Sequence, residues 1–113
     1  MNRLLEEAQK NITEALMWLG ECKGDPDGSS LRFNLWRAIE SLDYATLLMS
    51  LRFQLTEFYP EVDVKQPADR FQALRFVEET VREALKHLKT DPRAAYKLLK
   101  NCLSTLRALR EMV

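Results

Sequence analysis

The feature that most constrains this chain is the stretch from Leu31 to about Phe58, which is apolar on two opposite sides when wound as a helix. One side carries an ordinary inward stripe of Leu35, Ile39, Leu42, Thr46, Met49 and Phe53, widened by Leu31, Ala38 and Ala45. The opposite side carries Phe33, Tyr44, Leu47, Leu51, Leu55 and Phe58. A helix that is apolar all round is buried all round, so the second side needs a cover.

A chain of 113 residues has the length of one domain, and we expect residues 1–113 to form a single helical-bundle domain. The formal net charge is zero, but the charges are unevenly divided. Residues 1–69 hold seven Lys or Arg against twelve Asp or Glu, whereas residues 70–113 hold ten against five. The sequence shows neither an N-terminal signal pattern nor an apolar run of membrane-spanning length, which predicts a soluble, cytoplasmic protein without membrane contact.

Apolar residues recur at three- and four-residue steps in four segments, and this spacing predicts four helices. The segments run from about Asn2 to Lys23, from Leu31 to about Phe58, from Pro67 to about Lys89, and from about Pro92 to nearly the end of the chain. Glycine, proline, aspartate and serine cluster in the first connection, and proline with aspartate occurs in each of the other two. The turn before the last segment is short enough to return the next helix antiparallel. The sequence therefore predicts an all-α fold, a four-helix antiparallel bundle with one long central helix.

The residues that often bind metals lack the spacing of known sites. The turn at 25–30 contains two aspartates, but its glycine is the fourth residue counted from Asp25, whereas an EF-hand needs glycine at the sixth position. The twelfth residue is Trp36, where an EF-hand needs glutamate. Glu40 and Asp43 stand three residues apart without the Glu-x-x-His pattern of di-metal bundles, so helix-to-helix ion pairing is expected of them. Cys22 and Cys102 are predicted to be reduced, packed thiols on two different helices. We expect no metal and no cofactor.

The chain's single histidine, His87, follows Arg82 with four residues between them. This spacing resembles the R-x4-6-H motif of the HEPN family of helical RNases, and the resemblance covers six of the 113 residues. It implies that Arg82 holds a scissile phosphate and that His87 assists attack by the ribose 2′-hydroxyl, usually across a dimer interface. Five residues along a regular helix rotate a side chain by about 140°, so the two residues would flank the apolar stripe. The other interpretation of His87 is a surface or interface histidine.

Four basic residues share one side of the predicted last helix, within about 80° of one another. They are Arg93, Lys97, Lys100 and Arg107. A basic stripe can neutralise phosphates and give salt-sensitive, sequence-independent nucleic-acid binding. The alternative is a solvated helix face, which the zero net charge favours.

The uncovered side of the central helix decides the functional prediction. The other helices are shorter and have narrower stripes, so we predict that a second copy covers Phe33, Tyr44, Leu47, Leu51, Leu55 and Phe58 around a two-fold axis. The competing cover is the linker from Tyr59 to Gln66. The sequence thus predicts a small homodimeric interaction or adaptor protein without catalysis, which could also bind another protein. The alternative is a nucleic-acid-binding helical module, one form of which is a HEPN-like RNase that uses Arg82 and His87.

Overall fold

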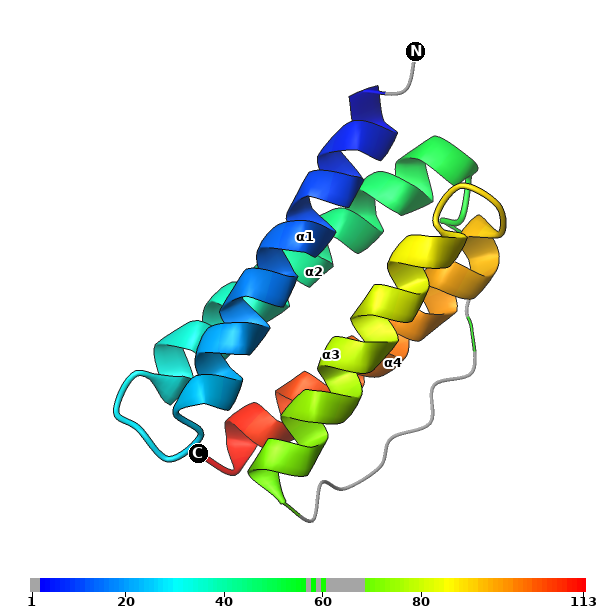
Figure 1. Ribbon diagram of the computed structural model, residues 1–113. Coiled ribbons are helices and arrows are strands. Elements are labelled where there is room, and N and C mark those ends of the chain that lie inside the picture. Colours follow the sequence, from blue (N-terminus) through cyan, green and yellow to red (C-terminus); the bar gives the residue numbers. More distant parts are fainter. Residues whose placement is uncertain (1–2, 57, 59, 61–68) are drawn as a thin grey trace.

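The computed structural model describes residues 3–56, 58, 60 and 69–113, and these residues form four helices (Figure 1). They are α1 (Arg3–Gly24), α2 (Leu31–Phe53), α3 (Arg70–His87) and α4 (Pro92–Glu111). α1 packs mainly on α2 and α3 mainly on α4, while smaller contacts join α2 to α4 and α1 to α3. Each helix therefore packs against two others, and the predicted all-α helical bundle is confirmed.

The order of the helices around the bundle is α1, α2, α4, α3. In Figure 1, α1 and α4 run from the top of the view towards the bottom, whereas α2 and α3 run from bottom to top. Just beyond α2, the ring of Phe58 lies 5.9 Å from the ring of Tyr96 near the start of α4. At the other end of the bundle, Arg70 at the start of α3 forms an ion pair with Asp27 in the α1–α2 turn. Neighbouring helices thus run in opposite directions.

α2 ends earlier than the sequence predicted. It stops at Phe53 instead of near Phe58, and its 23 residues exceed the 22 of α1 by one. Gln54 adopts the left-handed conformation, with φ 57° and ψ 49°. The backbone N–H groups of Gln54 and Leu55 both donate to the Ser50 carbonyl, the second at 2.9 Å, as in a Schellman-type helix end. α2 is therefore shorter than predicted and does not stand out in length from α1.

Aspartate side chains cap the N-termini of α3 and α4. Asp69 accepts a 2.8 Å hydrogen bond from the backbone N–H two residues later, and Asp91 accepts a 3.2 Å bond from the backbone N–H three residues later. α3 consequently begins at Arg70 and not at the predicted Pro67, because Asp69 supplies the cap. The predicted linker cover, apart from Pro60, lies outside the described residues.

Aliphatic side chains from all four helices fill the core. The fully buried ones include Ile12, Leu19, Leu35, Leu42, Met49, Leu74, Leu99, Leu103 and Leu106. Cys22 and Cys102 are buried among them as free thiols. Within the described part of the chain, no helix is both long enough and apolar enough to cross a lipid bilayer.

Candidate interaction surface

The solvent-facing side of α2 is apolar along most of its length. Five large side chains on this side are 46–55% exposed, and we call them the outer α2 stripe: Phe33, Trp36, Tyr44, Leu47 and Leu51. Four of them, together with Arg37 and Glu40, follow one another at alternating steps of four and three residues. This is the spacing of a heptad seam, which keeps a row of side chains on one side of a helix. α2 therefore presents to solvent the kind of row that usually faces another helix.

Leu55 and Phe58 do not belong to this stripe, which corrects the predicted interface. Leu55 is only 1% exposed, because the left-handed Gln54 stops the helix before Leu55 can follow the outer row. Phe58 packs against the core, and the guanidinium of Arg93 lies 5.1 Å from the centre of its ring. Both side chains close the end of the bundle instead of extending the exposed row. The other four residues of the predicted interface are exposed.

An aromatic cluster occupies the N-terminal end of the stripe. The ring of Trp18 on α1 meets Phe33 edge to face at 5.9 Å, and Phe33 meets Trp36 at 5.9 Å. The Arg37 guanidinium lies 5.2 Å from the ring centre of Trp18 and 5.7 Å from that of Trp36. These ring contacts hold the side chains in place before any partner binds. The sequence prediction missed Trp36, although its position three residues after Phe33 puts it at the edge of the same row.

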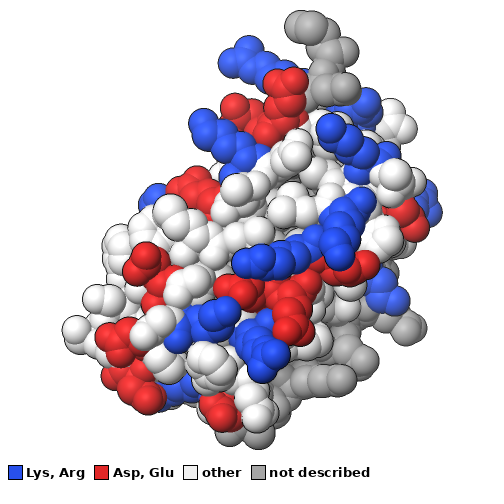
Figure 2. Space-filling view, viewed as in Figure 1, with Lys and Arg blue, Asp and Glu red and all other residues white. Residues whose placement is uncertain are grey.

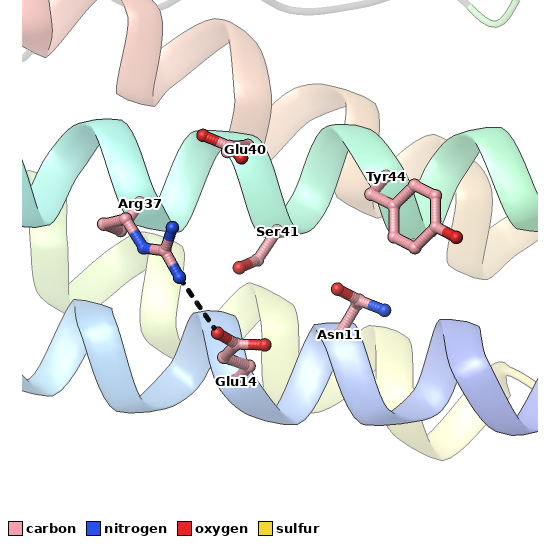
Figure 3. Close-up of a pocket in the computed structure, with 6 residues that line it drawn as sticks. All are labelled: Asn11, Glu14, Arg37, Glu40, Ser41 and Tyr44. Atoms are coloured by element: carbon pink, nitrogen blue, oxygen red, sulfur yellow. Dashed lines mark hydrogen bonds and ion pairs between the residues drawn. The ribbon is translucent and has the colours of Figure 1, made fainter.

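A polar pocket of about 130 Å³ lies between α1 and α2 beside the middle of the stripe (Figure 3). It is lined by Asn11, Glu14, Arg37, Glu40, Ser41 and Tyr44. Arg37 Nη2 lies 3.5 Å from Glu14 Oε1, whereas the side chains of Glu40 and Tyr44 have no hydrogen-bond partner among the described residues. The pocket is smaller than the roughly 300–1,000 Å³ of common small-molecule sites. The pocket is therefore better suited to polar contacts with a partner than to enclosing a cofactor.

The two carboxylates predicted to form helix-to-helix pairs lie on different sides of α2. Glu40 borders the pocket beside α1. Asp43 accepts two hydrogen bonds from Arg107 Nη2 of α4, at 2.6 and 2.9 Å. The two carboxylates therefore do not converge on one site, and the described residues contain no group of three or more side chains placed to hold a metal ion.

Only part of the predicted basic stripe on α4 is free of an anionic partner. Arg107 is paired with Asp43. Arg93 and Lys100 each lie over an aromatic ring, at 5.1 and 5.4 Å from its centre. Lys97 is exposed and has no partner within the described part of the chain. Pairing thus removes one of the four predicted positive charges from the stripe.

Arg82 and His87 bind different carboxylates along α3. Arg82 Nη2 lies 3.7 Å from Glu78 Oε1, an oxygen that also receives Lys23 Nζ of α1 at 2.8 Å. His87 Nε2 lies 3.1 Å from Glu83 Oε1. Each residue of the HEPN-like spacing is therefore held by an acidic neighbour of its own, and the structure shows no shared contact between the two among its described residues.

Positive and negative side chains are interleaved on the face that α1 and α3 form (Figure 2). The ion pairs Arg70–Asp27 and Arg107–Asp43 each join a basic residue of the second half of the chain to an acidic residue of the first half. The uneven charge division seen in the sequence is thus partly compensated by contacts inside the bundle.

Five of the ten large apolar side chains that are exposed in the described part of the chain belong to the outer α2 stripe. The remaining five are divided among α1, α3 and the C-terminus. Comparisons with protein-family models, with curated proteins and with solved structures found no match to this chain.

Proposed function

We propose that this protein is a cytoplasmic homodimer that acts through protein–protein contact and not through catalysis, with the outer α2 stripe at its two-fold interface. The observation that carries this proposal is the apolar character of both sides of α2. Its inner side is buried in the core, and its outer side exposes about half of each of five large side chains. Because the solvent side of a bundle helix is ordinarily polar, the stripe indicates a surface that is covered when the protein functions.

The area of the stripe suits such an interface. Five side chains of about 200 Å² each, half exposed, leave roughly 500 Å² of apolar surface on each copy. This lies within the roughly 300–600 Å² of the largest patch on a typical monomer, a patch that is often functional. Pairing two copies would remove about 1,000 Å² of apolar surface from water, which is about the minimum area expected of a biological interface.

The composition of the stripe also favours a protein partner. Phe33, Trp36 and Tyr44 are aromatic, and Arg37 lies beside them. Aromatic residues and arginine are enriched in the centres of protein interfaces, where lysine is depleted. A second copy is the simplest such partner, because two-fold pairing of one surface with itself is the commonest symmetry of soluble oligomers.

The test is sedimentation at micromolar concentration, where we expect a dimer of the 13.2 kDa chain. Replacing Leu51 by Glu should convert the dimer into monomers, because a two-fold interface would then hold two unpaired carboxylates. Losing the burial of one leucine on each copy alone should raise the dissociation constant at least about 100-fold. A single wild-type species near the chain mass would contradict the proposal.

Phe76→Glu is the matched control for this substitution. Phe76 is a large apolar residue that is 48% exposed, like Leu51, but it lies on α3 away from the outer α2 stripe. The Phe76→Glu variant should remain a dimer, and circular dichroism should show native helix content in both variants. A dimer that survives Leu51→Glu would place the interface on another surface.

The competing proposal is a nucleic-acid-binding helical module that uses the basic side of α4. The exposed Lys97, together with Arg93 and Lys100, supports it. The pairing of Arg107 with Asp43 weakens it, because a charge already neutralised in the bundle contributes little to phosphate binding. An RNase that uses Arg82 and His87 would in addition have to release both side chains from their carboxylates.

A further inference from the structure

The outer α2 stripe has a direction. Its N-terminal end is aromatic, with Phe33 and Trp36, and its C-terminal end is aliphatic, with Leu47 and Leu51. Between these ends the row contains two charged residues. Because the row is not symmetric about its middle, parallel and antiparallel pairings of two copies bring different residues together.

A parallel pairing about a two-fold axis would place each residue of the row against the same residue of the other copy. Glu40 would then face Glu40 in the middle of a seam that excludes water. Arg37 has a counter-charge in Glu14 at 3.5 Å, but Glu40 has none among the described residues. Two carboxylates without a counter-ion repel more strongly as water is removed. The parallel arrangement is therefore unfavourable at its centre.

An antiparallel pairing centred at the level of Leu42 avoids this repulsion. Positions at equal distances from 42 then face each other across the axis: 33 with 51, 37 with 47, and 40 with 44. The Glu40 carboxylate meets the Tyr44 hydroxyl, and a hydroxyl donates a short, strong hydrogen bond to a carboxylate. Figure 3 shows the Tyr44 hydroxyl pointing away from Ser41, and the Tyr44 side chain is about half exposed, so the hydroxyl is accessible to a partner.

The other pairs of this register are also compatible. The ring of Phe33 faces Leu51, which pairs an aromatic end with an aliphatic end. Arg37 faces Leu47, and its guanidinium is already held by Glu14 and by two indole rings. The methylene stem of Arg37 is then free to pack against the leucine.

We propose that two copies pair antiparallel through the outer α2 stripe, with the two-fold axis at the level of Leu42 and Tyr44 of each copy donating a hydrogen bond to Glu40 of the other. This inference rests on the proposed homodimer and adds its orientation, its register and its central polar contact. It places the two α1–α2 turns at opposite ends of the dimer.

Distances between spin labels on two copies of the full chain distinguish the orientations. Single added cysteines at Arg32 and Gln54, written Arg32→Cys and Gln54→Cys, place labels on exposed positions near the two ends of α2. The native Cys22 and Cys102 are buried, and the wild-type protein treated with the same label is the control. At 1.5 Å per residue, the antiparallel dimer separates the Arg32→Cys labels by about 30 Å and the Gln54→Cys labels by about 35 Å.

Each outcome of this measurement is informative. Two long distances support the antiparallel pairing. Two distances below about 20 Å, as expected for helices packed side by side at 8–10 Å, would show a parallel dimer and overturn this inference while leaving the homodimer intact. A monomer in sedimentation would instead overturn the homodimer itself.

The central polar contact is tested by Glu40→Gln. In the antiparallel dimer this variant loses a charge-assisted hydrogen bond on each side of the axis, and the dissociation constant should rise about ten-fold. Tyr44→Phe should weaken the dimer to a similar degree. Glu79→Gln on α3 removes the same charge away from the stripe and should leave the constant unchanged. A tighter dimer in Glu40→Gln, or no change in both stripe variants, would overturn the proposed contact.

Discussion

At the scale of single residues, burial determines the chemistry of the two thiols. Burial raises the pKa of Cys22 and that of Cys102 to about 12, because the thiolate loses its hydration inside the core. A backbone hydrogen bond opposes this rise at each residue without cancelling it. Both groups are therefore protonated and unreactive at neutral pH, and neither is a candidate nucleophile.

We expect the free energy of unfolding to fall as the pH rises above about 9. The unfolded chain begins to lose its thiol protons near pH 9, whereas the folded protein keeps them until about pH 12. The stability that these groups contribute is thus complete below pH 9 and is lost progressively up to pH 12. Between pH 8 and pH 10 each thiol should account for a loss of about 1.4 kcal/mol, measured by urea unfolding.

The double variant Cys22→Ala, Cys102→Ala isolates the contribution of the two thiols from that of the rest of the chain. It lacks both thiols, so its stability should fall by about 3 kcal/mol less than that of the wild type between pH 8 and pH 10. Each substitution also leaves a small cavity, and this lowers stability equally at both pH values. Identical pH dependence in the two proteins would contradict buried, protonated thiols.

At the scale of helices and turns, the backbone at the C-terminal end of α2 is strained, and a substitution can relieve the strain. Gln54 has φ 57°, a conformation that side chains with a Cβ atom disfavour and that glycine adopts freely. We expect Gln54→Gly to raise the free energy of unfolding by about 0.5–1 kcal/mol, because the left-handed turn then forms without that steric penalty. Urea unfolding measures the change.

Gln54→Ala is the control for this change, since alanine keeps the Cβ atom that causes the strain. It should leave stability equal to or slightly below that of the wild type. A loss of stability in Gln54→Gly would mean that the Gln54 side chain makes a favourable contact that outweighs the strain.

The sequence predicted the existence of the helices better than their ends. The three- and four-residue spacing identified Leu35, Leu42 and Met49 as inward residues, and all three are fully buried. The end of α2 was not predictable in this way, because the helical spacing of apolar residues continues to Phe58 without glycine or proline before it. The burial of Leu55 against the rest of the bundle accompanies the break, and one helix alone cannot show it.

Only the features of the candidate site that lie within one helix were predictable from the sequence. Phe33 and Leu51 lie one above the other on a helix, so their shared exposure follows from the helical period. The Arg107–Asp43 pair joins residues 64 positions apart, and no spacing within either helix indicates it. Long-range contacts of this kind decide which charges of α4 remain available to a partner.

At the scale of the whole molecule, the distribution of charge limits nucleic-acid binding. The net charge is zero, and one cation of the predicted α4 stripe is neutralised by Asp43. Affinity for a polyanion grows with the number of phosphates that cations neutralise together. The stripe is therefore weaker than its four basic residues indicate in the sequence, and we expect the wild-type protein to leave heparin at low salt.

We expect Asp43→Asn to raise the salt concentration at which the protein leaves heparin. This substitution releases Arg107, which then adds to Arg93, Lys97 and Lys100 on the same side of α4. In the wild-type background, replacing Lys97 and Lys100 by Glu should change elution only slightly, because the wild-type protein is expected to bind heparin weakly. Elution from a heparin column with a salt gradient measures both effects.

Asp27→Asn separates the release of Arg107 from the change in net charge. Asp27 pairs with Arg70 at 3.5 Å in the α1–α2 turn, so its substitution adds the same unit of positive charge outside α4. Asp43→Asn should shift elution further than Asp27→Asn, because only the former extends a continuous row of cations. Equal shifts would mean that the column senses net charge alone. Strong wild-type retention that disappears when Lys97 and Lys100 become Glu would instead favour the nucleic-acid-binding module over the proposed interaction protein.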